Sequence, residues 1–167
     1  WVKENHKSDS YRSISRRYFE LSKTLPASAV LSIPKGQISI YDPLFKKYAK
    51  QIDWDWRILA AQAYNESHFD TLAASWAGAR GLMQLMPRTA QAFGVSMNEI
   101  TNPEKNIGAA VKSIQSLNKS LADIEDKNER IKFILAAYNG GLGHILDAMA
   151  LAKKYGKNPH VWDKNVS

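Results

Sequence analysis

Three short blocks of the sequence carry side chains that could do acid–base chemistry or bind a polar substrate. Glu66 and Ser67 stand at the end of an apolar run, residues 59–63. Residues 75–87 combine glycines with amide and thioether side chains, and residues 136–141 place a tyrosine and an asparagine before two glycines. A carboxyl, an amide and a phenol hydroxyl can together donate, accept and transfer protons, so we treat these blocks as one candidate site.

Glu66 is the candidate acid of this site. It follows apolar residues on the same predicted helix, so its carboxyl group is expected to be partly desolvated, and desolvation raises the pKa of an acid. A helix C-terminus also disfavours an anion. A raised pKa is what a general acid needs to keep its proton near neutral pH. Taken alone, Glu66 is better explained as a surface glutamate, so the catalytic interpretation depends on the other two blocks.

The other two blocks suit the wall of a sugar-binding cleft. Residues 81–84 join a flexible turn to an amide and a polarisable thioether, which offer hydrogen bonds and apolar contact in one segment. The same residues could instead form a tight turn packed by Met83 and Met86. The hydroxyl of Tyr138 could orient Glu66, although a capped helix end with a core tyrosine also explains this block.

A series of helices must position these blocks, and hydrophobic periodicity predicts where the helices lie. Asp42 is expected to cap the first of them, with Pro43 at its first position, and Asp55 to cap a second that ends near Ser67. Residues 69–85 are expected to form a loop. Further helices are predicted from Pro87 to Gly94, from Pro103 onward, from about Asn128 to Gly140, and from Leu142 to Lys154. The helix that starts at Pro103 is expected to bury Ile107, Val111, Ile114, Leu117 and Leu121. The helix that starts near Asn128 is expected to turn Ile131, Ile134, Leu135 and Tyr138 inward.

Together the three blocks resemble the catalytic domain of the soluble lytic transglycosylases (SLT), a lysozyme-like family that cleaves peptidoglycan. That family reads Glu-Ser, then Ser-x-x-Gly-Ala-x-Gly-Leu-Met-Gln-Leu-Met-Pro-x-Thr-Ala, then Ala-Ala-Tyr-Asn, and residues 75–90 match the middle block closely. Asn102-Pro103 and Asn106-Ile107 match a linking motif of the family. The resemblance covers about residues 42–155. It implies a mainly α fold, a lysozyme-like (goose-type, SLT) helical domain with an N-terminal linker segment.

Residues 42–64 look most like the membrane-bound type F members of this family, which carry a periplasmic-binding-protein-like module before the catalytic domain. Residues 42–167 are therefore expected to be the catalytic domain. Residues 1–41 are expected to be an N-terminal extension: a helix-compatible stretch to residue 25, then an extended connector, together the tail of a regulatory module plus linker. Membrane attachment through a missing N-terminal region, and a periplasmic or cell-envelope location at the outer membrane, follow from the same resemblance.

The activity that the resemblance implies is lytic cleavage of the β-1,4 bond between N-acetylmuramic acid and N-acetylglucosamine. Glu66 would protonate the leaving oxygen and then, as a carboxylate, accept the proton of the C6 hydroxyl, leaving a 1,6-anhydromuramoyl end without using water. The enzyme would be a carbon–oxygen lyase similar to glycoside hydrolase family 23. Ordinary glycosidases use two carboxylates, but the matched blocks hold no second acid, and Asp70 is better explained as a loop or capping residue.

The resemblance also implies which residues assist Glu66. The expected substrate-binding residues are Ser75, Met83, Gln84, Tyr138 and Asn139, with Tyr138 also positioning Glu66. The expected supporting residues are Ser67, at the end of the helix, and Gly81, in the turn.

Composition narrows the remaining alternatives. The chain has 167 residues, a formal charge of +7 with scattered basic residues, and no cysteine, so thiolate metal sites are excluded. The four histidines lack metal-ligand spacing, and we predict neither a metal nor a cofactor. The expected partner is the glycan strand of peptidoglycan, and no nucleic acid, because no basic-aromatic repeat occurs. A goose-type lysozyme that hydrolyses the same bond and a non-catalytic peptidoglycan-binding domain stay open as alternatives.

Overall fold

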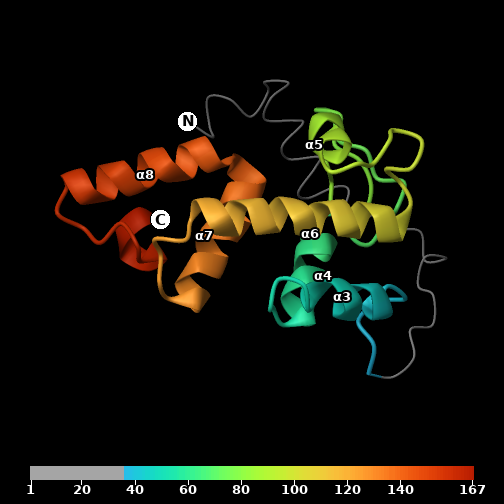
Figure 1. Ribbon diagram of the computed structural model, residues 1–167, viewed down its shortest axis with the longest axis horizontal. Helices are drawn as coiled ribbons and strands as arrows, with labels where there is room; N and C mark the ends of the chain where they lie inside the picture. The colour runs from blue at the N-terminus through green and yellow to red at the C-terminus, as the bar shows by residue number, and fades with distance from the viewer. Residues whose placement is uncertain (1–35) are drawn as a thin grey trace, which may run out of the picture. The chain divides into compact units, whose positions relative to one another are not determined.

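The computed structural model describes residues 36–167, of which Ile38–Ser167 form one compact unit (Figure 1). Two isolated β-bridges, Ala74 with Arg80 and Arg80 with Leu85, tie the long loop together, and the described residues contain no extended strand. The mainly helical fold is thus confirmed for this part of the chain, and the helix expected before residue 25 lies outside it. The elements are α3 (Asp42–Ala49), α4 (Trp56–Ser67), α5 (Pro87–Ala92), α6 (Pro103–Ser120), α7 (Lys127–Gly140), α8 (Leu142–Lys154) and the C-terminal turn η4 (Trp162–Val166).

Helix α6 is the hub of the unit, because α3, α5 and α7 all pack against it (Figure 1). Asn102 caps the helix by accepting a hydrogen bond from the backbone N–H of Lys105, and Pro103 occupies its first turn. The predicted buried face is confirmed at Ile107, Val111 and Ile114, which are fully buried. Of the other two predicted residues, Leu117 is half-buried and Leu121 is buried just past the helix end.

The start of α3 differs from the prediction. Asp42 was expected to be the N-cap, but Tyr41 takes that position and Asp42 is the first helical residue. The buried Asp42 carboxylate accepts hydrogen bonds from the backbone N–H groups of Ile38 and Ser39, at 2.9 and 2.8 Å. The side chain therefore faces the turn before the helix and satisfies backbone donors there, rather than those of the first helical turn.

Helix α4 follows its prediction at both ends. Asp55 caps it, since the carboxylate accepts a 2.9 Å hydrogen bond from the backbone N–H of Arg57. Ser67 is the last helical residue, and His68 leaves the helix in a left-handed conformation, with φ of 53°. The buried face includes Leu59, Gln62 and Ala63, so the residues before Glu66 pack into the core as the apolar stripe predicts.

Helix α7 begins at Lys127, capped by Asp126, one residue earlier than the predicted start. Of the four residues expected to face inward, Ile134 is buried and Tyr138 packs against the core while keeping part of its surface exposed, whereas Ile131 and Leu135 are partly exposed outside the core cluster. The buried neighbours of Ile134 are instead Phe133 and Ala137. The C-terminal turn explains why Phe133 is buried. Its Trp162 packs edge-on against Phe133, with ring centroids 5.2 Å apart, and covers that side of the helix.

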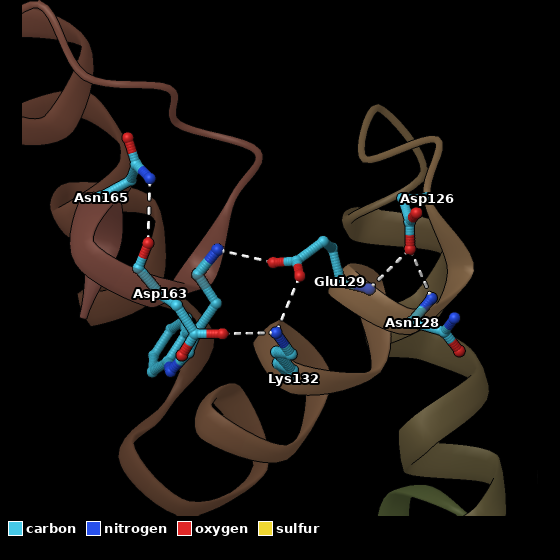
Figure 2. Close-up of polar contacts among 7 residues, drawn as sticks. Asp126, Asn128, Glu129, Lys132, Asp163 and Asn165 are labelled. Carbon is cyan, nitrogen blue, oxygen red and sulfur yellow. Dashed lines mark hydrogen bonds and ion pairs between the residues drawn. The ribbon is translucent and has the colours of Figure 1, made fainter.

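An ion-pair cluster ties the C-terminal turn to the first two turns of α7 (Figure 2). Lys132 lies 2.8 Å from Glu129 on the same helix and 2.7 Å from Asp163 in η4. The second carboxylate oxygen of Glu129 accepts a 2.7 Å hydrogen bond from the backbone N–H of Trp162. The hydrogen bonds to Asp163 and Glu129 raise the pKa of Lys132. The helix that carries Tyr138 and Asn139 is thus held from its outer side.

Candidate functional site

A cleft of about 470 Å³ opens between α4 and α7, and Glu66 lies in its wall. Glu66 is neither fully buried nor fully exposed, so its carboxyl group stands at the border between the core and the cleft. The cleft is lined by Asp55, Arg57, Ile58, Ala61, Gln62, Asn65 and Glu66 from the α4 side and by Leu135 and Asn139 from α7. Two of the predicted site residues, Glu66 and Asn139, therefore come together across the cleft from helices that are distant in sequence.

Ser67 fastens the end of α4 to the turn at residues 81–84, which begins with Gly81. Its buried hydroxyl donates to the backbone carbonyl oxygen of Leu82 at 2.8 Å, and it also lies 3.2 Å from the carbonyl oxygen of Ala63 in the preceding helical turn. Leu82 is itself fully buried. Because Glu66 precedes Ser67, this bond fixes the helix end on which the candidate acid sits.

The turn at residues 81–84 depends on glycine and on a buried asparagine. Gly81 has φ of 79°, and a Cβ atom there would lie 2.5 Å from Nδ2 of Asn106 and 2.8 Å from the carbonyl oxygen of Ile100. Asn106 is fully buried and accepts a 2.8 Å hydrogen bond from the backbone N–H of Met83. Its amide donates to the carbonyl oxygens of Arg80 and Ile100, at 3.1 and 2.7 Å. Two hydrogen bonds of one side chain on α6 thus hold residues 80–83, and a third ties the same side chain to Ile100.

Tyr138 joins α7 to the same turn and approaches Glu66. Its hydroxyl donates a 2.8 Å hydrogen bond to the carbonyl oxygen of Met83. Burial raises the pKa of Tyr138 far above its ordinary value, and the negative charge of Glu66 raises it further. Tyr138 therefore stays a neutral hydrogen-bond donor over the whole physiological pH range, close enough to Glu66 to feel its charge.

The remaining predicted residues belong to the loop beside the cleft. The backbone N–H of Ala79 donates to the hydroxyl oxygen of Ser75 at 3.0 Å, which closes a tight turn. The amide of Gln84 donates to the carbonyl oxygens of Ala73 and Gly81, at 3.2 and 3.0 Å. Met83 is 0% exposed, so its thioether packs in the core and does not reach the cleft surface in this structure. Its carbonyl oxygen accepts the hydrogen bond from Tyr138.

Among residues 36–167, no second carboxylate is suitably placed to share the chemistry of Glu66. Asp55 is the other acid that the described part of the chain contributes to the cleft, but it lies eleven positions earlier, which is ~16 Å along the helix axis. Glycosidases that use two carboxyl groups hold them about 5 to 9.5 Å apart. Hydrogen bonds from Arg57 also lower the pKa of Asp55 to about 2, so it carries no proton near neutral pH. Asp70 caps its loop, as expected, by accepting from the backbone N–H of Leu72.

Two residues important for this geometry were not among the predicted site residues. Asn106 matched a linking motif, but nothing in the sequence shows that its side chain holds residues 80–83. Gln62 lines the cleft and is 7% exposed, although its place on the apolar stripe of α4 was visible in the sequence. Within residues 36–167, no three His, Cys, Asp or Glu side chains are grouped in a way that could hold a metal ion.

Comparison with known proteins shows to which family the chain belongs. Residues 43–161 match the family described as the transglycosylase SLT domain. Among solved structures, the chain is similar to an inactive mutant of lytic transglycosylase Slt from Pseudomonas aeruginosa, in which glutamine replaces one glutamate, with a TM-score of 0.55 and 24% identity. The match covers 66% of this chain but 18% of that one, so it shows a shared fold over a small part of a longer protein. The family match spans most of the sequence and includes all three chemical blocks, and the chain belongs to the transglycosylase SLT family.

Proposed function

We propose that this chain is a peptidoglycan lytic transglycosylase that cleaves the β-1,4 bond between N-acetylmuramic acid and N-acetylglucosamine. The observation that carries the proposal is a cleft in which the described residues supply one usable carboxyl group, Glu66, in a chain of the SLT family. Because Asp55 is distant and held ionised by Arg57, a mechanism that needs only one carboxylate fits the cleft better than the two-carboxylate hydrolysis of ordinary glycosidases.

In the proposed reaction Glu66 acts first as an acid and then as a base. Its proton passes to the glycosidic oxygen as the bond from that oxygen to C1 of N-acetylmuramic acid breaks, and the sugar's own acetamido group stabilises the positive centre. The C6 hydroxyl oxygen of the same sugar then bonds to C1, and its proton returns to Glu66. The products are a free 4-hydroxyl group and a 1,6-anhydromuramoyl end, and no water is consumed.

The geometry around Glu66 supports its role through positioning. Ser67 anchors the end of α4 to Leu82, and Tyr138 connects α7 to Met83. Both walls of the cleft are therefore hydrogen-bonded to the turn at residues 81–84. A fixed turn between two helices keeps the acid and the substrate in a reactive arrangement, which is where much of the rate enhancement of such enzymes arises. The neutral hydroxyl of Tyr138 also suits a site whose acid changes its charge during the cycle.

Of the five residues expected to bind substrate, we keep that role for three, and Tyr138 keeps its expected role of positioning Glu66. Asn139 lines the cleft directly, and Ser75 and Gln84 lie in the loop that is tied to the turn. We propose that these three contact the glycan or its peptide stem. For Met83 we propose a packing role in place of a sugar contact, because its side chain is fully buried.

We further propose that residues 42–167 are the catalytic domain of a type F-like enzyme and that residues 1–41 are the tail and linker of a regulatory N-terminal module. The carbon–oxygen lyase class, similar to glycoside hydrolase family 23, belongs to the same proposal. Since peptidoglycan lies outside the cytoplasmic membrane, the place of action would be the periplasm, with attachment to the outer membrane through a further N-terminal region. No helix in the described residues is long and apolar enough to cross a membrane.

Product analysis tests the proposed reaction. Purified peptidoglycan is digested with the chain, and the released muropeptides are examined by mass spectrometry. The lyase should yield 1,6-anhydromuramoyl ends, which are lighter by one water than the hydrated ends of a hydrolase. Hydrated ends alone would show a goose-type lysozyme activity, and binding to the polymer without any released fragment would show a non-catalytic domain.

A further inference from the structure

The oxygen of the Gln62 side chain is a buried hydrogen-bond acceptor that has no donor among the residues that the structure describes. The residue as a whole is 7% exposed and lines the same cleft as Glu66. Burying an amide oxygen without a donor is unfavourable, and native proteins seldom leave such groups unpaired. A neighbouring group that becomes a donor when its protonation state changes would therefore satisfy the oxygen of Gln62.

Glu66 is the group that can supply this donor. Gln62 and Glu66 are separated by four positions on α4, which places them one helical turn apart on the same face, with Cβ atoms about 6 Å from each other. An ionised carboxylate only accepts hydrogen bonds, but a protonated carboxyl group carries an O–H donor. Of the other amide side chains in the cleft, Asn65 and Asn139 are exposed and face solvent, which makes them poorer partners for a buried oxygen.

We propose that Gln62 is a positioning residue whose amide oxygen accepts a hydrogen bond from the protonated carboxyl group of Glu66. The interaction forms in the acid state of Glu66 and is lost when the proton leaves, so it stabilises the form that must start the reaction. The catalytic use of that form rests on the proposed function, but the hydrogen bond itself does not. It deepens the assignment of the site by adding a residue that selects one protonation state of the acid.

Other charged and titratable groups near the cleft are shared by every variant compared below. On α4 these are Asp55 and Arg57, which pair with each other, and His68 just past the helix end. On α7 the nearest is Tyr138, which remains neutral. On α3, which packs against α4, Lys46 lies over the ring of Trp56 at the far end of the helix. A substitution at Gln62 alone leaves these charged and titratable groups unchanged.

A titration of Glu66 in the substrate-free chain tests the proposal directly. Side-chain carboxyl signals of ¹³C-labelled glutamate are followed by NMR against pH, with Glu66→Gln used to assign the signal. Gln62→Met keeps the length of the side chain and removes the acceptor, and it should lower the titration midpoint of Glu66 by about half to one pH unit. The matched control is Ile58→Met, one turn earlier in the same cleft, which should leave the midpoint unchanged.

A second measurement keeps the proposal testable if the signal of Glu66 is broadened. The thermal stability of Gln62→Met relative to the wild type should rise as the pH increases through the Glu66 titration, because above it the wild type holds an unpaired oxygen. A stability difference that does not vary with pH, or equal Glu66 midpoints in wild type and Gln62→Met, would overturn the proposal. The alkaline limb of the pH profile of kcat/KM should move with the midpoint. A chain without activity but with the NMR shift would contradict only the proposed function.

Discussion

The hydroxyl of Tyr138 donates a 2.8 Å hydrogen bond to the carbonyl oxygen of Met83, and this contact links two segments 55 residues apart. One segment is the end of α7, which supplies Asn139 to the cleft. The other is the turn that Ser67 fastens to the end of α4. This bond thus connects the two walls of the cleft in which Glu66 lies through the turn at residues 81–84.

Tyr138→Phe should therefore impair the site more than the fold. The substitution leaves the carbonyl oxygen of Met83 without its donor, which should lower the free energy of unfolding by about 1 to 2 kcal/mol. Loss of positioning should reduce kcat/KM on the order of tenfold to hundredfold. Denaturant titration and a peptidoglycan turnover assay measure the two effects. Tyr155→Phe, at an exposed tyrosine after α8, is the control and should change neither. Equal activity of Tyr138→Phe and wild type would contradict the positioning role.

The loop between α4 and α5 should tolerate a side chain at Gly78 but not at Gly81. Gly78 has φ of 91° and Gly81 has φ of 79°, and an alanine is strained at both angles. A Cβ atom at Gly78 meets nothing within 4 Å, whereas at Gly81 it would lie within 3 Å of Asn106 and of the Ile100 carbonyl oxygen. Gly78→Ala should cost about 1 kcal/mol of stability and Gly81→Ala roughly 3 kcal/mol or more. Similar losses for the two variants, measured by chemical denaturation, would show that Asn106 and Ile100 can move aside.

The bond between Ser67 and Leu82 should contribute measurably to stability. Ser67→Ala removes the donor of a buried carbonyl oxygen and should lower the free energy of unfolding by about 1 to 2 kcal/mol. Ser120 provides the control, because its hydroxyl makes the same contact to the carbonyl oxygen four residues earlier, at 3.2 Å, but is exposed and reaches no second segment. Ser120→Ala should be close to neutral. If both variants lose the same amount, the contact within the helix, and not the one to Leu82, explains the effect.

The cap of α4 should make stability depend on pH in the acid range. Hydrogen bonds from Arg57 lower the pKa of Asp55 to about 2, compared with about 3.9 in an unfolded chain. The ionised cap therefore stabilises the fold fully above pH 4, and this contribution is lost as the pH falls towards 2. Asp55→Ala should lower Tm by a few degrees at pH 7 and by less at pH 2. Asp123→Ala, at an exposed aspartate before α7, is the control for the loss of an aspartate and should leave Tm at pH 7 close to that of the wild type.

Local signals in the sequence were sufficient to predict most helix boundaries. Asp55 and Pro103 mark helix starts through capping and proline geometry, and Gly141 separates α7 from α8, because these effects involve only neighbouring residues. The same reasoning failed at Asp42, because its carboxylate had donors on both sides and pairs with those of the preceding turn. The bonding choice of such a side chain depends on how the chain enters the helix.

The inward face of α7 could be predicted only in part, because the spacing of its apolar residues does not show which other segments cover them. Trp162, far along the chain, buries Phe133 and leaves Leu135 to line the cleft. The candidate site shows the same limit. The motifs indicated Glu66 and its assistants, but the three hydrogen bonds of Asn106 and the burial of Met83 and Gln62 arise from packing between distant segments.

The central claim is that Glu66 is the acid that starts glycan cleavage. Glu66→Gln keeps the size of the side chain and removes its ability to transfer a proton. Release of muropeptides should fall on the order of a thousandfold or more, while binding to insoluble peptidoglycan and the melting temperature stay close to those of the wild type. Anhydromuropeptides released by Glu66→Gln at the wild-type rate would contradict the assignment.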